Sequence, residues 1–458
     1  MRTFKQHIAE NSGLRFIYEN LNIKSSIGRK YLLNSEFVND KDELETILTC
    51  ISKAIDYILK NKNTDLLKKL NHDLCEINDI STSIKSLKEG IILDDIALFE
   101  IKKFSIVSEK IKESFDKSCF KDIIIFDLTD VVNILDPESS RIPSFYIYSA
   151  YNDELTQLRK EKETEQDETK AEKIRERCNE IEDEIRQNIS KKLTKFANRI
   201  SHNLEQFAYI DIIFAKAEIA INQNFARPEI SNKTEYTAVF NPQISKNLIE
   251  QGKSFQPIDI SINNEPILIT GANMSGKSVL LKTIALCQYL FQFGFFIPAK
   301  SAKVKIVDEI IMSFGDNQNE MNGLSSFAVE MLNINTIIAE AKSGKNILAL
   351  VDELARTTNP DEGKAFVSAF VQLMSKLKVS CLITTHYSGI KTNCSRLMVK
   401  GLSGIKKTDK ITVKNINNFM DYSLLETNND SVPNEAIRIA EILEIDSEFI
   451  QITKSKLE

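Results

Sequence analysis

One run constrains this 458-residue sequence more than any other feature: Gly271-Ala-Asn-Met-Ser-Gly-Lys-Ser278. It matches the pattern G-x-x-x-x-G-K-[S/T], follows an apolar run at Ile267–Thr270, and precedes a helical pattern at Val279–Phe291. A strand, a glycine-rich turn and a helix in this order form a P-loop, whose backbone N–H groups cradle phosphates. We therefore expect this part of the chain to bind a nucleotide such as ATP.

The residues of this loop have distinct expected roles. Its glycines let the backbone approach the phosphates, and the N-terminus of the following helix adds a favourable dipole. Lys277 would reach the β- and γ-phosphates, and Ser278 would ligate Mg²⁺. The predicted nucleotide site comprises Gly271, Ala272, Asn273, Met274, Ser275, Gly276, Lys277, Ser278 and Val279.

Two further apolar runs end in residues that suit nucleotide hydrolysis. The run that begins at Asn346 ends in Asp352, which would hold Mg²⁺ through water, and Glu353, which would orient or deprotonate the attacking water. The run Ser380–Thr384 leads to His386, which either contacts the γ-phosphate or the lytic water, or serves as a capping or packing residue.

The pattern of apolar residues divides the chain into two domains. Residues 10–120 have apolar positions at three- and four-residue spacing, which is typical of helices. From Tyr236 onward, short apolar runs alternate with helical patterns, which is typical of a mostly parallel sheet with crossover helices. We expect an α-helical core over residues 1–230, followed over 231–458 by an α/β P-loop ATPase domain of the ABC class.

Within the core, residues 151–201 are dense in charged residues and Gln. This composition suits two long solvated helices that form an antiparallel arm, and equally an ordinary solvent-exposed helix. The apolar run Ile123–Phe126 is a short strand or a buried helix, and Leu204–Asn222 is a strongly apolar helix.

Charge and cysteine usage bear on partners and location. The net charge of −6 shows no basic excess of the kind that phosphate neutralisation usually requires, which weakens a DNA-binding role without removing it. The seven cysteines contain no CxxC pair, so we expect reduced thiols in a cytoplasmic protein. The sequence shows neither a signal-peptide pattern nor an apolar run of membrane-spanning length.

Together these motifs resemble those of the MutS family of DNA mismatch repair proteins. The resemblance covers the P-loop with its Asn-Met pair, the Walker B and D-loop run Asp352–Gly363, and the signature segment Gly323–Met331. It implies that Ser325 reaches across a dimer to the partner's γ-phosphate, so that ATP and Mg²⁺ sit in composite sites of a homodimer or heterodimer. Phe255 stands where the family has a ring that stacks on adenine, and core packing explains it equally well.

The resemblance extends beyond the ATPase domain. Ser25–Leu32 and Leu204–Ala220 resemble parts of the MutS helical core, or lever, and residues 151–201 stand where its clamp would be. Pro433–Ile452 resembles the helical C-terminal extension of the family. We expect no mismatch-reading domain, because the resemblance to the core begins close to the first residue.

Three functional alternatives follow from the resemblance. The first is a dimer that binds DNA structures in repair or recombination. In the second, short MutS-like ATPases of this outline resemble the reactivating factor of adenosylcobalamin-dependent lysine or ornithine aminomutases, an ATP-dependent chaperone. The acidic balance, the missing mismatch-reading domain and the run Asn359-Pro-Asp-Glu-Gly363 favour this alternative. The third is a structural ATP-binding dimer that hydrolyses ATP slowly. Ser275 and Val279 replace the usual Gly and Thr of the MutS loop, and we expect nucleotide binding to survive both changes.

Overall fold

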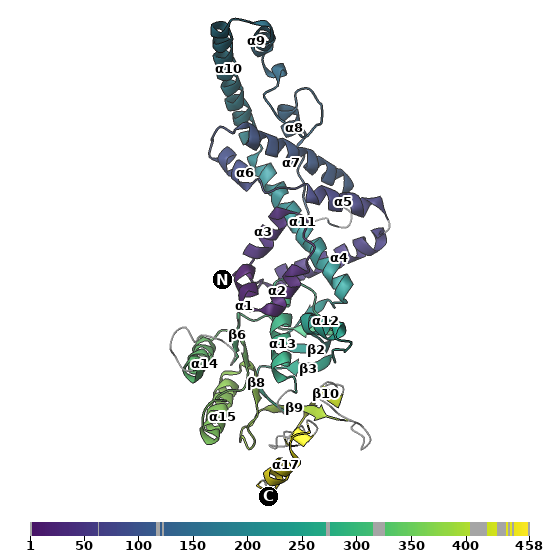
Figure 1. Cartoon of the computed structure of the whole chain (residues 1–458), viewed down its shortest axis with the longest axis vertical. Coiled ribbons are helices and arrows are strands. Elements are labelled where there is room, and N and C mark those ends of the chain that lie inside the picture. Colours follow the sequence, from purple (N-terminus) through teal and green to yellow (C-terminus); the bar gives the residue numbers. More distant parts are fainter. Residues whose placement is uncertain are drawn as a thin grey trace. The chain divides into compact units, whose positions relative to one another are not determined.

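The computed structural model describes residues 2–62, 64–115, 120, 123–271, 275–314, 326–403, 419–427, 437, 440–441 and 444–456. The chain forms two compact units (Figure 1). Unit 1 contains Met1–Asn20, Glu36–Leu48 and Ile219–Glu458, and unit 2 contains Leu21–Ser35 and Thr49–Glu218. Within the described residues, no helix combines the length and apolar character needed to cross a membrane.

Helices build unit 2. Several begin at a side-chain cap: Asp94, Asn152 and Asp167 each accept a hydrogen bond from a backbone N–H of the first turn. Two long helices, α4 (Lys41–Asn61) and α11 (Ala197–Gln223), belong to both units. The other elements of unit 2 are α3 (Ser26–Asn34), α5 (Asp65–Cys75), α6 (Ser81–Lys88), α7 (Asp95–Ser114), α8 (Thr129–Leu135), the short 3₁₀ helix η1 (Ser149–Tyr151), α9 (Asp153–Thr164) and α10 (Glu168–Thr194).

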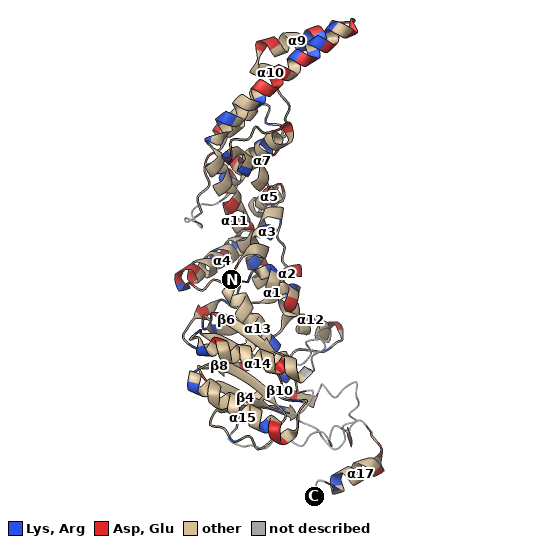
Figure 2. Cartoon of the chain, turned by 90° about the vertical axis from the view of Figure 1, so that its left-hand side faces the viewer, with Lys and Arg blue, Asp and Glu red and all other residues tan. Residues whose placement is uncertain are grey.

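The charged segment forms α9 and α10, which pack against each other within unit 2. Leu155 is fully buried, and acidic and basic residues are interspersed along both helices (Figure 2). Arg177 Nε lies 2.8 Å from Glu154 Oε1, and Arg159 Nη2 lies 2.9 Å from Glu182 Oε1. Part of the charge in this segment therefore pairs between the two helices.

The run Ile123–Phe126 is neither a strand nor a helix, which corrects the sequence-based expectation. The buried side chain of Asn203 on α11 accepts a hydrogen bond from Phe126 N at 2.8 Å and donates one to Phe126 O at 2.9 Å. A side chain thus satisfies backbone groups of the run that a strand would pair with a neighbouring strand.

Unit 1 contains two sheets, with strand orders β1-β5-β2-β3 and β10-β9-β4-β8-β7-β6. In the second sheet, β9, β4, β8, β7 and β6 are parallel, and β10 pairs antiparallel with β9. The strands are β1 (Pro228–Ile230), β2 (Thr234–Val239), β3 (Ile258–Ile262), β4 (Pro266–Thr270), β5 (Ser301–Val304), β6 (Glu309–Ser313), β7 (Ile347–Val351), β8 (Ser380–Thr385), β9 (Ser395–Leu402) and β10 (Met420–Glu426).

The three central strands β4, β8 and β7 are buried at every position, as expected for parallel strands that are covered on both faces. They lie where the sequence predicts apolar strands. The helices of unit 1 are α1 (Phe4–Glu10), α2 (Ser12–Glu19), α12 (Pro242–Glu250), α13 (Lys277–Gln292), α14 (Ser326–Lys342), α15 (Pro360–Leu377) and α17 (Ser447–Ser455).

The N-terminal residues of the chain pack on α13. The two compact units therefore do not follow the single domain boundary near residue 230 that the sequence predicts. The Phe4 ring lies 4.8 Å from the Phe293 ring, measured between centroids. Val38 N donates a hydrogen bond of 2.9 Å to Gln292 O at the end of α13. The first helices and residues 36–48 therefore belong with the α/β elements, although most of unit 2 separates them from those elements in the sequence.

Candidate functional site

The turn between β4 and α13 requires glycine at two positions. A Cβ atom on Gly271 would lie 2.8 Å from Ser275 Oγ and 3.2 Å from Val399 Cβ. Gly276 has a φ of +84°, which favours glycine, and a Cβ there would lie 3.0 Å from Cδ1 of Tyr422. Ala272, Asn273 and Met274 lie outside the described residues.

Ser275 and Lys277 are buried in this turn. Ser275 is 2% exposed, and its hydroxyl has no hydrogen-bond partner among the described residues. Lys277 is 5% exposed, and its ammonium group lies 2.9 Å from Gly271 O and 3.6 Å from Glu353 Oε1. Burial lowers the pKa of Lys277, and the nearby carboxylates of Glu353 and Asp352 oppose this shift. Lys277 therefore joins the glycine turn to the carboxylate at the end of β7.

The carboxylates Asp352 and Glu353 follow β7, and Thr384 of the neighbouring strand β8 holds both residues. Thr384 Oγ1 donates a hydrogen bond of 2.6 Å to Asp352 Oδ1 and accepts one of 2.9 Å from Glu353 N. Asp352 N donates to Ser313 O at the end of β6, at 2.9 Å. The carboxyl ends of parallel strands meet at one edge of a sheet, and this places the two carboxylates at the same edge as the glycine turn.

His386 lies one residue beyond β8 and is half-buried. Burial lowers its pKa from the ordinary value of 6.5; the positive charges of Lys277 and Arg356 lower it further, and Glu353 opposes them. The imidazole is therefore mostly neutral at pH 7. His386 thus lies close enough to Glu353 and Lys277 to interact with their charges. The sequence predicts that these three residues share one site.

A cavity of about 600 Å³ lies beside the glycine turn. Phe255, Gly276 and Val279 line it, together with Met420 and Tyr422 of β10. Gln256 fixes β10 to this cavity: its Oε1 accepts a hydrogen bond of 2.9 Å from Tyr422 N, and its Nε2 donates one of 2.9 Å to Asp421 Oδ1. Phe255 thus lines a cavity beside the predicted phosphate loop, and stacking of its ring on adenine would need such a cavity.

The remaining predicted residues are only partly described. Ser278 lies half-exposed in the first turn of α13, directly after Lys277. Ser325 lies outside the described residues, and α14 begins with the next residue in the chain. Among the described residues, no three His, Cys, Asp or Glu side chains are grouped in a way that would hold a metal ion.

Sequence reasoning assigned no role to Thr384 or Tyr422. Thr384 belongs to the run Thr384-Thr-His-Tyr387, but the sequence does not show that its hydroxyl faces the neighbouring strand. Tyr422 is far from the glycine turn in the chain, and no motif marks it. Only the sheet order brings these side chains to the site.

The fold and the candidate site define the class of this domain. It is an α/β domain whose candidate functional side chains lie at the carboxyl ends of the strands of a mostly parallel sheet. Residues 267–458 match the family model of MutS domain V, which is an ATPase domain. This part of the chain is similar to the MutS family, whose members are ATPases.

Several curated proteins that are similar in sequence to this chain have names of the MutS family. The DNA mismatch repair protein MutS of Acetivibrio thermocellus is 33% identical over 238 residues, which cover 48% of this chain and 27% of that protein. MutS of Thermus aquaticus is 31% identical over 206 residues, covering 45% and 24%. The endonuclease MutS2 of Caldanaerobacter subterraneus is 33% identical over 206 residues, covering 44% and 25%. The chain thus matches about a quarter of the length of these relatives.

Proposed function

We propose that this chain binds and hydrolyses ATP at the carboxyl edge of its larger sheet. The observation that carries the proposal is the position of Lys277, whose ammonium group lies 2.9 Å from Gly271 O and 3.6 Å from Glu353 Oε1. A single side chain therefore connects the phosphate-binding turn to a carboxylate that can activate water. The match of residues 267–458 to an ATPase domain supports this assignment.

The nucleotide would lie along the turn from Gly271 to Ser278. The Ser275 hydroxyl supports this assignment, because it is buried and has no hydrogen-bond partner among the described residues. Such a hydroxyl costs free energy that a phosphate oxygen would recover. The N-terminus of α13 would face the phosphates. The base would occupy the cavity beside Phe255 and Tyr422, whose rings suit stacking on a purine.

Ser278 and Asp352 would hold Mg²⁺, and the ion would neutralise charge on the phosphates. Thr384 binds Asp352 Oδ1, so Asp352 Oδ2 is the oxygen that we assign to the hydrated ion. One hydroxyl and one carboxylate suit Mg²⁺, which usually keeps several waters and takes substrate phosphates as ligands.

Glu353 would orient or deprotonate the attacking water, and neutral His386 would donate or accept a hydrogen bond beside the γ-phosphate. When phosphate oxygens bind Lys277, they would replace Glu353 as its partner. Glu353 would then be available to the water. Dimerisation would bring Ser325 of one subunit to the γ-phosphate of the other, as the family resemblance implies.

Phosphate release from Mg·ATP by the purified chain tests the proposal. We expect Glu353→Gln to keep its affinity for ATP and to lose about 100-fold or more in turnover, because it removes the general base. We expect Ser325→Ala to slow hydrolysis while ATP binding and folding stay normal. Glu340→Gln is a matched control, because Glu340 pairs with Lys345 on the surface of unit 1. Normal turnover in Glu353→Gln would disprove the role of Glu353, and normal turnover in Ser325→Ala would disprove the role of Ser325.

We further propose that the ATPase serves the recognition of DNA structures in repair or recombination. The names of the relatives support this client, since they describe DNA mismatch repair and endonuclease proteins. The alternative client, an adenosylcobalamin-dependent aminomutase, gains no support from these relatives. We expect branched or duplex DNA to stimulate the ATPase rate.

A further inference from the structure

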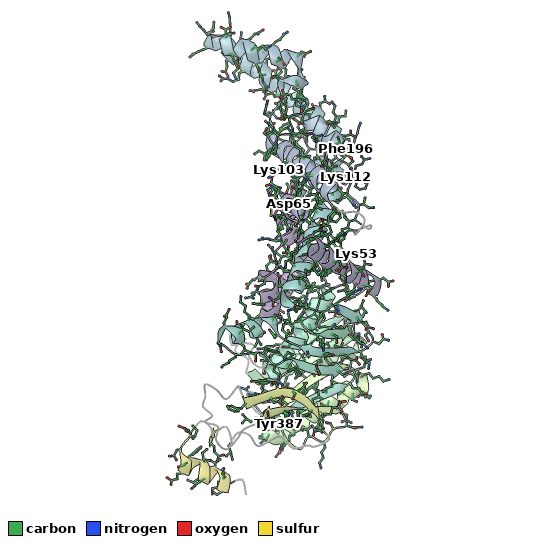
Figure 3. All side chains as sticks on the ribbon, turned by 90° about the vertical axis from the view of Figure 1, so that its right-hand side faces the viewer. Lys53, Asp65, Lys103, Lys112, Phe196 and Tyr387 are labelled. Atoms are coloured by element: carbon green, nitrogen blue, oxygen red, sulfur yellow. The ribbon has the colours of Figure 1, made fainter. Side chains whose placement is uncertain are left out.

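Side chains from two other elements hold both backbone polar groups of Ala355. Ala355 is fully buried two residues beyond Glu353. Its N–H donates a hydrogen bond of 2.7 Å to Glu330 Oε1 on α14, and its carbonyl accepts one of 2.6 Å from the hydroxyl of Tyr387, which follows β8. We call Glu330, Tyr387 and Ala355 the Ala355 clamp; Figure 3 labels Tyr387.

The clamp acts on a strained stretch of backbone. Glu353 has a φ of +51° and Ala355 a φ of +59°, in the left-handed region that residues with a Cβ atom rarely adopt. Such conformations persist only where the surrounding structure fixes them, and they cluster at functional sites. The hydrogen bonds to Ala355, together with the bond from Glu353 N to Thr384, tie this stretch to other elements of the fold.

Tyr387 is itself held in place. Its ring is buried, and its N–H donates a hydrogen bond of 3.0 Å to Thr385 Oγ1. The ring lies directly against Gly363 of α15, where an added Cβ would be only 2.7 Å from Tyr387 Cε2. Gly363 therefore leaves the space that the tyrosine needs to reach Ala355.

Glu330 is placed for the same purpose. Its carboxylate is half-buried, and burial raises its pKa, while the Ala355 N–H and the positive charge of Arg356 oppose that shift. Arg356 Nη1 also lies 3.4 Å from Glu353 Oε2. Glu330 therefore contacts the same short stretch of chain whose first side chain is the proposed general base.

We propose that Glu330 and Tyr387 are positioning residues for hydrolysis: they hold Ala355, and through it keep the Glu353 carboxylate beside Lys277. This inference rests on the proposed ATPase function. It adds that three segments together position the general base: α14, the turn after β8 and the chain after Glu353. Loss of either hydrogen bond to Ala355 would leave the nucleotide turn intact and misplace only the general base.

The test measures kcat, KM and ATP affinity of single variants of the full chain. Tyr387→Phe removes only the hydroxyl, Glu330→Ala removes the acceptor, and Glu330→Gln keeps an acceptor oxygen. We expect Tyr387→Phe and Glu330→Ala to lower kcat about tenfold or more with ATP affinity unchanged, because small misplacements of a reacting group are costly. Glu330→Gln should retain most of the wild-type kcat.

Two controls match these variants. Tyr236→Phe also removes one buried tyrosine hydroxyl, but that hydroxyl has no hydrogen-bond partner among the described residues and lies in the other sheet. Glu340→Ala removes a glutamate from the same helix, α14, where it pairs only with the exposed Lys345 among the described residues. Neither control should change kcat.

Hydrogen exchange in the absence of nucleotide gives a readout that does not depend on activity. Exchange in the peptide that contains Ala355 should be faster in Tyr387→Phe and Glu330→Ala, and unchanged in Glu330→Gln and both controls. Unchanged exchange would disprove the clamp, and faster exchange with wild-type kcat would disprove its positioning role. If the wild-type chain hydrolyses no ATP, the proposed function fails and so does this role in catalysis, while exchange still decides whether the clamp exists.

Discussion

Thr384 connects two residues of the candidate site through one hydroxyl. Its Oγ1 donates to Asp352 Oδ1 and accepts from Glu353 N, and the side chain is fully buried. A buried donor or acceptor that loses its partner costs about 1–3 kcal/mol. The hydroxyl therefore matters both for the stability of unit 1 and for the orientation of the two carboxylate residues.

We expect Thr384→Val, which keeps the shape of the side chain, to destabilise the protein by about 1–3 kcal/mol, since Glu353 N–H loses its acceptor. The variant should also need more Mg²⁺ for half-maximal hydrolysis, because Asp352 is no longer oriented. Thr384→Ser keeps the hydroxyl and should restore most of both properties. Denaturant unfolding and magnesium titrations of phosphate release measure these effects. Equal behaviour of Thr384→Val and the wild type would contradict the assignment.

Helix α1 illustrates how an element far from the candidate site in sequence becomes part of unit 1. The imidazole of His7 stacks on Phe37 with ring centroids 5.0 Å apart, and lies 4.9 Å from the Tyr289 ring and 5.8 Å from the Phe293 ring. Burial lowers the pKa of His7 to about 4; the charge of Arg2 adds to the shift and Glu10 opposes it. The packing of α1 on α13 therefore favours the neutral form of His7.

This shift predicts a pH dependence of stability with a definite sign. Between about pH 6.5 and pH 4 the unfolded state binds the proton on His7 and the folded state does not, so stability falls as pH decreases through this window. We expect His7→Phe to gain on the order of 1 kcal/mol relative to the wild type between pH 7 and pH 5, after allowance for solvent screening. Denaturant unfolding at both pH values measures the difference.

The exposed His72 on α5 provides the control for the His7 experiment. His72→Gln should follow the wild-type curve, because the change removes an exposed side chain and leaves the buried His7 in place. Parallel curves for His7→Phe and the wild type would show that His7 does not govern the docking of α1.

The helices α9 and α10 show what a charged pattern determines and what it leaves open. Their composition predicts solvated helices, and the structure forms two helices there with ion pairs such as Arg177–Glu154 between them. Such exposed pairs contribute little to stability, because water screens the charges and ordering the two side chains costs entropy. Buried Leu155 contributes more to holding α9 on its neighbours than any of these pairs does.

The whole molecule carries a net charge of −6, so any DNA contact must come from a local surface. If the proposed DNA role holds, branched or duplex DNA should stimulate the ATPase rate, and the stimulation should fall steeply as salt rises, because counterion release accompanies phosphate contact. Phosphate release across a salt series, with Glu353→Gln as the inactive control, measures this. A rate indifferent to every DNA would contradict the DNA role and direct attention to a protein client, beginning with an adenosylcobalamin-dependent aminomutase.

The sequence by itself determined the local elements of the candidate site. Buried apolar runs predicted β4, β7 and β8, because such patterns depend only on neighbouring residues. The spacing of Gly271, Gly276 and Lys277 predicted the turn before α13 for the same reason. The roles of these residues stay predictions until hydrolysis is measured.

Only the tertiary structure decided which distant residues meet. The strand order β9-β4-β8-β7-β6 joins Thr384 to Asp352, and the packing of α14 joins Glu330 to Ala355. The same holds for Asn203, whose side chain takes the backbone hydrogen bonds of Phe126 in a run whose apolar residues led us to expect a strand or a buried helix. Hydrogen bonds between remote segments depend on sheet order and helix packing, and a local pattern of residues contains neither.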